Sequence, residues 1–137
     1  MNTIYRASLE EVSTCFGRGT AQRRLVTGRL EYVYELVRRT GKPERFIIFG
    51  SYVTSKAEPN DVDIILIMRD DFQEQDYTAE VIPVLDHLRA QRELGVSVFR
   101  TRPGALPLET VDEFLEHWQV KRDLGRRGIV EIVVELT

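Results

Sequence analysis

Cysteine is almost absent from this 137-residue chain, in which Cys15 is the one example. A lone cysteine cannot form an intrachain disulfide, so we expect the protein to fold in a reducing compartment. Apolar runs are also short, and none approaches the roughly 18 residues of a membrane-spanning helix. The N-terminal residues lack the basic-then-apolar profile of a secretory signal. Together these absences predict a cytoplasmic protein with no membrane segment.

The chain also lacks a strong excess of charge. Its 19 Lys and Arg residues stand against 22 Asp and Glu residues, for a net charge of −3. This balance argues against a protein whose main affinity comes from neutralising many phosphates. It is compatible with a local basic patch, and residues 121–127, the most basic stretch, are a candidate platform for RNA or for substrate phosphates. A composition that is 42% hydrophobic and 30% charged is typical of a soluble globular protein.

Helix signals dominate the N-terminal third. Ser8 and Glu11 form a capping-box pattern, which predicts a short helix that ends near Phe16. Thr20 can cap a second helix over residues 21–40, where apolar side chains recur at helical spacing.

Strand signals follow from residue 45 onwards. Apolar runs at residues 45–49 and 61–68 predict buried strands, because they are apolar on both faces. The remaining expected elements are strands at 96–99 and 129–136 and helices at 52–56, 77–94 and 110–118. The helix at 77–94 should be kinked near Pro83 or start there, and Gly95 should end it. The alternation predicts an α/β (α+β) fold with a mixed sheet flanked by helices. We expect a single domain over residues 1–137, with a helical segment at 1–41 and a sheet-containing core at 45–137.

The strongest chemical pattern lies between residues 49 and 64. Asp61 and Asp63 are two residues apart at the start of an apolar strand, so their side chains should leave the same face about 7 Å apart. Two adjacent carboxylates repel each other unless a positive charge lies between them. Hard oxygen ligands of this kind suit Mg²⁺ or Mn²⁺, so both aspartates are candidate metal ligands and catalytic residues.

Gly50 and Ser51 precede these acids where the first buried strand stops. Glycine permits close approach of a ligand to the backbone, and free N–H groups with the Ser51 hydroxyl can hold phosphate oxygens. Lys56, in the same loop, is a candidate partner for a triphosphate. A phosphate cradle and a metal clamp would then lie side by side.

This Gly-Ser and Asp-x-Asp arrangement over residues 49–64 resembles the signature of the DNA polymerase beta-type nucleotidyltransferase superfamily. It is similar to minimal bacterial nucleotidyltransferase-like proteins of a subgroup whose substrate is not established, and to relatives that act as toxins or antitoxins. The resemblance implies a nucleotidyltransferase-like mixed sheet, with Asp61 and Asp63 on Mg²⁺ or Mn²⁺ and Gly50 and Ser51 at the phosphates of an NTP, most readily ATP. It further implies transfer of a nucleoside monophosphate to a hydroxyl of a protein, an RNA or a small molecule.

The resemblance also implies a third carboxylate on a later strand, and here the chain departs from the pattern. Ser97 stands where that acid is expected. Glu93 and Glu131 are alternatives from neighbouring segments, although neither is at a matching position. The alternative interpretation is therefore a catalytically degenerate binding module that contacts a partner protein, such as a component of a toxin–antitoxin pair.

Overall fold

The two N-terminal helices begin where their capping residues predict. The computed structural model describes residues 4–54, 58–105, 110, 113–115 and 129–135. Helix α1 (Leu9–Phe16) starts with the capping box, in which Ser8 Oγ accepts from the Glu11 N–H and Glu11 Oε1 accepts from the Ser8 N–H. Helix α2 (Ala21–Arg39) is capped by Thr20 Oγ1, which accepts from the backbone N–H three residues on. Both helix predictions are confirmed.

A five-stranded mixed sheet forms the centre of the molecule. Its strands are β1 (Ile4–Ala7), β2 (Pro43–Phe49), β3 (Asp63–Met68), β4 (Ser97–Thr101) and β5 (Ile129–Ile132). Their order across the sheet is β1-β5-β2-β3-β4. Strand β2 is antiparallel to both β3 and β5, whereas β3 pairs in parallel with β4, and β1 with β5. The predicted α/β class with a mixed sheet is confirmed.

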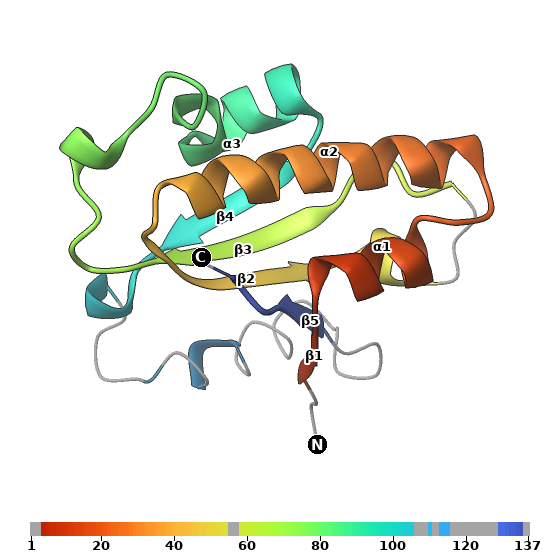
Figure 1. The fold of residues 1–137 in the computed structure, drawn as a ribbon, viewed down its shortest axis with the longest axis horizontal. Helices are drawn as coiled ribbons and strands as arrows, with labels where there is room; N and C mark the ends of the chain where they lie inside the picture. The colour runs from red at the N-terminus through yellow and green to blue at the C-terminus, as the bar shows by residue number, and fades with distance from the viewer. Residues whose placement is uncertain (1–3, 55–57, 106–109, 111–112, 116–128, 136–137) are drawn as a thin grey trace.

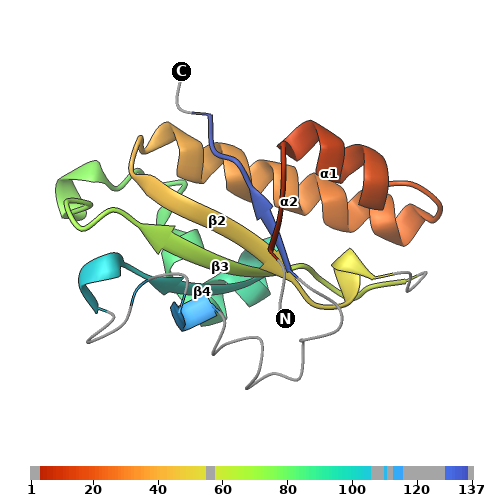
Figure 2. The same ribbon diagram turned by 90° about the horizontal axis from the view of Figure 1, so that it is seen from below.

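Both faces of the central strands are buried. Helices α1 and α2 lie side by side over one face (Figures 1 and 2). The α2 residues Val26, Leu30, Val33 and Val37 join one core cluster with Phe46, Ile48, Ile64 and Leu66 of the sheet. The alternate strand residues Ile47, Phe49, Ile65 and Ile67 pack on the opposite face with Leu115 and Ile129. This two-sided burial explains why β2 and β3 are apolar runs rather than alternating sequences.

The helix expected over residues 77–94, kinked near Pro83 or starting there, is divided into short helical pieces that begin at Ile82. The chain forms instead a 3-10 helix at Ile82–Leu85, the one-turn α3 (His87–Arg89) and a π-helical turn, η4 (Ala90–Leu94). Pro83 lacks an N–H for a continuous helix, and Asp86 restarts the helix as a new N-cap by accepting from two backbone N–H groups. Gly95 ends η4 in the left-handed conformation, as expected of a C-terminal glycine.

Several other boundaries differ from the sequence predictions. Strand β1 lies in the segment expected to be helical only, and it joins that segment to the sheet through β5. Strand β3 begins at Asp63 rather than Asp61, and β5 ends at Ile132 rather than at residue 136. Of the expected helix at 52–56, the described residues belong to a 3-10 turn at Ser51–Val53 and the bend after it. Of the expected helix at 110–118, the described residues 113–115 are helical.

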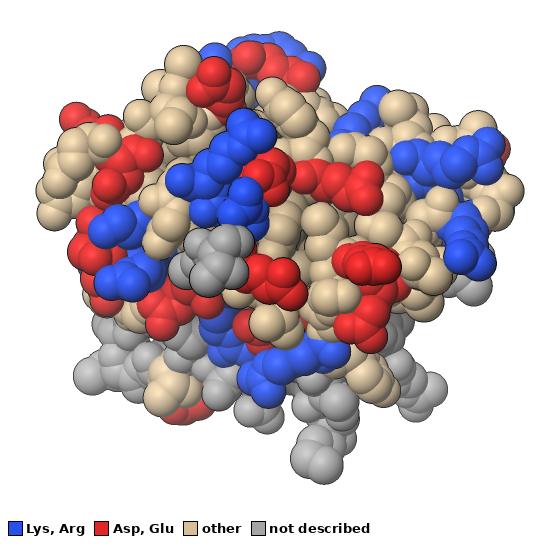
Figure 3. Space-filling view, in the orientation of Figure 1, with Lys and Arg blue, Asp and Glu red and all other residues tan. Residues whose placement is uncertain are grey.

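The surface mixes charges of both signs. On the face drawn in Figure 3, Lys and Arg side chains lie among Asp and Glu side chains. Cys15 is free and exposed. Among the described residues, no helix combines the length and the apolar composition needed to cross a membrane. The basic stretch at 121–127 lies outside the described residues.

Candidate active site

Gly50 ends β2 in a conformation that requires glycine. Its backbone has φ 85° and ψ −163°, a region that side chains exclude. A Cβ atom at this position would lie 2.1 Å from Oδ2 of Asp63, so the Asp63 carboxylate lies directly against the glycine backbone. The structure therefore brings together the two halves of the pattern, the Gly-Ser bend and the Asp-x-Asp acids.

Asp61 and Asp63 meet at Ser97 on the neighbouring strand. Asp63 and Ser97 are register partners in the parallel β3–β4 pair, so their side chains leave the same face of the sheet. The Ser97 hydroxyl donates to Oδ2 of Asp61 over 2.7 Å. Both aspartates are half-buried, whereas Ser97 is 5% exposed. Asp61 and Asp63 thus both lie beside Ser97. Asp61, however, precedes β3 and is not part of the strand.

Neither alternative for the third carboxylate reaches this place. Glu93 Oε2 accepts from Arg89 over 2.7 Å on the surface of its own helical segment. Glu131 Oε1, on β5, accepts from Arg45 over 2.6 Å and from Arg6 over 3.3 Å. Within the described part of the chain, no three Asp, Glu, His or Cys side chains are grouped closely enough to share a metal ion.

An arginine on α2 holds the loop that follows Gly50. The Arg23 guanidinium, whose residue is 7% exposed, donates to the backbone carbonyls of Phe16, Tyr52 and Thr54. Sequence reasoning missed this contact. The available signal was the position of Arg23 on the buried stripe of α2, three residues before Val26 and seven before Leu30.

Two further α2 side chains complete the attachment of this loop. Thr27 Oγ1 shares a 2.6 Å hydrogen bond with the Tyr52 hydroxyl, and burial raises the pKa of that tyrosine. Gln22 Nε2 donates to the Pro59 carbonyl over 2.9 Å, on the other side of the loop. The backbone that carries the Gly-Ser bend is therefore fixed to the helix layer at both ends.

The expected phosphate-binding elements are only partly described. Ser51 begins a three-residue turn, which is too short to supply the aligned N–H groups and dipole of a full helix. Its half-buried side chain and the turn backbone remain as candidate phosphate donors. Lys56 lies outside the described residues.

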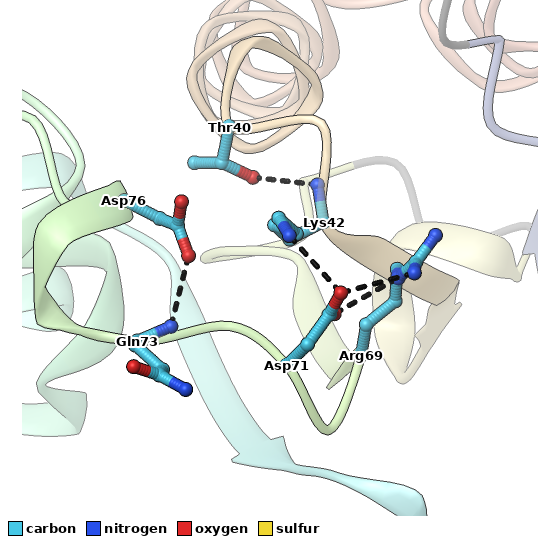
Figure 4. Close-up of polar contacts among 6 residues, drawn as sticks. All are labelled: Thr40, Lys42, Arg69, Asp71, Gln73 and Asp76. Carbon is cyan, nitrogen blue, oxygen red and sulfur yellow. Dashed lines mark hydrogen bonds and ion pairs between the residues drawn. The ribbon is translucent and has the colours of Figure 1, made fainter.

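A second pair of acids, Asp70 and Asp71, follows the opposite end of β3. Asp71 accepts from Arg69 over 3.0 Å and from Lys42 over 3.1 Å (Figure 4). The Arg69 hydrogen bond, followed by that of Lys42, lowers the pKa of this carboxyl. Asp70 accepts from the Gly104 N–H and from Arg102, and these contacts lower its pKa as well.

Comparison with known proteins yields one match. Residues 1–133 match the family described as "Family of unknown function (DUF6932)", and the chain belongs to that family. No curated protein and no solved structure matches the chain. The geometry of the site is therefore the basis for assigning its chemistry.

Proposed function

We propose that this family member is a metal-dependent nucleotidyltransferase, which transfers a nucleoside monophosphate from an NTP, most readily ATP, to a hydroxyl of a protein, an RNA or a small molecule. The observation that carries the proposal is the convergence of Asp61 and Asp63 on Ser97, directly against Gly50. This convergence joins segments that are 36 residues apart in sequence. It creates a group of oxygen ligands directly beside the Gly-Ser bend.

The oxygen donors fit Mg²⁺ or Mn²⁺. Two half-buried carboxylates and a hydroxyl oxygen are hard ligands, and partial exposure lets water complete the coordination. Asp61 receives its hydrogen bond from a neutral hydroxyl, and no Lys or Arg among the described residues forms an ion pair with it. In the proposed site Asp61 and Asp63 hold the cation, which when bound neutralises phosphate charge and acidifies the attacking hydroxyl.

The remaining groups orient the reactants. Gly50 lets the Asp63 carboxylate lie directly against the backbone, and the Ser51 hydroxyl donates to phosphate oxygens. Ser97 keeps the Asp61 carboxylate in place through its 2.7 Å hydrogen bond. The acceptor oxygen forms a bond to the α-phosphorus while the bond from that phosphorus to the bridging oxygen breaks. Pyrophosphate leaves, and the hydroxyl proton passes to solvent water.

Transfer is tested with α-labelled NTPs, Mg²⁺ or Mn²⁺, and a lysate from the native host. We expect label to enter an acceptor with the wild type and to fall at least about 100-fold with Asp63→Asn, because the cation loses a charged ligand. Asp71→Asn is the matched control, since it removes an acid from the opposite end of β3. Equal labelling by wild type and Asp63→Asn, or no labelling with any NTP, would contradict transfer.

A second candidate function is nucleotide binding without transfer, in a module that acts through a partner protein as in a toxin–antitoxin pair. The observation that favours it is Ser97, which supplies a hydroxyl where a third acid is expected. Calorimetry with Mn²⁺ and a non-hydrolysable ATP analogue distinguishes the two. Binding that Asp63→Asn abolishes, together with no label transfer and a stable partner that co-purifies from the native host, would favour this second function.

A further inference from the structure

A second surface feature lies beside the candidate site, in a groove between α2 and η4. Its volume is about 960 Å³, and its walls include Arg24, Arg29 and Tyr32 from α2, and Gln91, Arg92 and Glu93 from η4. We call it the arginine groove. Neither the metal site nor the phosphate cradle uses any of these side chains.

The arginine groove carries an excess of positive charge. Three of its residues, Arg24, Arg29 and Arg92, are cationic, and its one acid, Glu93, already accepts from Arg89 outside the groove. The side chains of Arg24 and Arg29 form no hydrogen bond or ion pair with any other residue that the structure describes. In a chain with a net charge of −3, such a local excess of unneutralised arginine points to an anionic ligand.

The groove is shaped as well as charged. The Arg29 guanidinium lies against Gly95, where a Cβ atom would come within 2.8 Å of its Cζ atom. Tyr32, three residues further along α2 and therefore on the same side, is 52% exposed. An added Cβ at Gly28, on the same wall, would meet no atom within 4 Å. The arginine groove is thus lined by the exposed Tyr32 ring, by the Arg29 guanidinium packed on Gly95, and by the unobstructed backbone at Gly28.

A chain of hydrogen bonds connects the arginine groove to the acids. Gln91 Nε2, from the groove wall, donates to Ser97 Oγ over 3.1 Å, and Ser97 in turn donates to Asp61. Gln91 therefore contacts both the arginine groove and the hydroxyl that holds Asp61.

We propose that the arginine groove binds a single-stranded nucleic acid and presents its hydroxyl as the acceptor for transfer. Arginine guanidinium groups pair with phosphate oxygens, and an exposed tyrosine ring stacks on a base. Proteins that bind single-stranded nucleic acids combine these two kinds of contact. An acidic peptide would use the arginines but not the ring. The role as acceptor rests on the proposed transferase function, whereas binding in the groove does not.

Fluorescence polarisation tests the binding directly. The probes are a labelled single-stranded RNA of about 12 nucleotides, the DNA of the same sequence and a polyglutamate of equal charge, in EDTA and without nucleotide. We expect the nucleic acids to bind and Arg24→Gln/Arg29→Gln to weaken binding roughly tenfold. The slope of log affinity against log salt should fall by about 1.4, or about 0.7 for each lost phosphate contact. Tyr32→Leu should weaken binding roughly fivefold through lost stacking.

The matched control is Arg39→Gln/Arg102→Gln, which removes two charges outside the groove and should leave binding unchanged. Circular dichroism melts of all variants verify folding. Equal loss in the control variant, or polyglutamate binding as tight as that of the nucleic acids, would overturn the proposal. RNA and DNA binding of equal strength supports a site that reads phosphate and base, and stronger RNA binding identifies the acceptor as RNA. Nucleic-acid binding by the wild type with no label transfer from any NTP would refute the transferase while leaving the groove intact.

Discussion

The two ends of β3 carry the same residue type in different surroundings. After its C-terminal end, Asp70 is neutralised by Arg102. Asp71 is neutralised by Arg69 and Lys42 (Figure 4). Asp61 and Asp63, at its N-terminal end, meet a serine hydroxyl and a glycine backbone. The carboxylates of the first pair have fixed cations, and their pKa values are lowered.

A pair of neighbouring acids therefore indicates a cation site only when no basic side chain already neutralises it. Exposed ion pairs such as those of Asp71 contribute little to stability and leave little capacity for another cation. Asp61 accepts from a neutral hydroxyl instead, and no Lys or Arg among the described residues forms an ion pair with it. The comparison therefore separates a surface ion-pair network from a candidate binding site on one strand, and three predictions test that separation.

The largest effect is expected at the glycine of the N-terminal end. Gly50→Ala should lower the free energy of unfolding by about 3 kcal/mol, because the backbone conformation excludes a side chain and the new Cβ would meet the Asp63 carboxylate. Gly41→Ala is the control, since its φ of 70° is also positive but its Cβ would meet no atom within 4 Å. That change should cost only about 1 kcal/mol. Urea unfolding measures both, and equal losses would show that the Asp63 contact is unimportant.

An intermediate effect is expected from restoring the missing acid. Ser97→Asp should lower the free energy of unfolding by roughly 2 kcal/mol without metal, because a third carboxylate joins two others at a buried position. Added Mn²⁺ should reverse the loss, with binding tightened by roughly tenfold relative to wild type in calorimetry. Ser97→Ala, which only removes the hydroxyl, serves as the control. A Ser97→Asp protein that Mn²⁺ fails to stabilise would argue against a metal site at this end.

The smallest effect concerns the C-terminal end. NMR titration should find the pKa of Asp71 below its ordinary value of 3.8, and Arg69→Gln should raise it more than Lys42→Ala does, because the Arg69 hydrogen bond has the larger influence. A lowered pKa stabilises the folded state above pH 3.8, and this contribution is lost as the pH falls through the folded-state value. Since the pair is exposed, the thermal melts of both variants at neutral pH should match wild type closely. A large drop in melting temperature would show that the ion pairs of Asp71 with Arg69 and Lys42 contribute substantially to stability.

Much of the fold was readable from local sequence. The Ser8–Glu11 capping box, the Thr20 cap and the helical spacing over residues 21–40 each depend on residues a few positions apart. The apolar runs of β2 and β3 likewise predicted buried strands. The helix expected at 77–94 allowed for an interruption or a start at Pro83, but its apolar pattern gave no sign of the second interruption at Asp86, which caps a new helical turn.

Local sequence patterns are sufficient to predict the caps, the buried strands and the nearness of the Gly-Ser bend to the Asp-x-Asp acids, because these follow from short-range periodicity and sterics. The long-range partners of each polar side chain became visible only in the folded chain. Arg23 holds a loop about thirty residues away, Ser97 reaches Asp61 across 36 residues, and Glu131 is bound by Arg6 across 125. β1 likewise becomes a strand through its pairing with β5 at the far end of the chain. Such contacts depend on how helices and strands pack, and no local pattern encodes that arrangement.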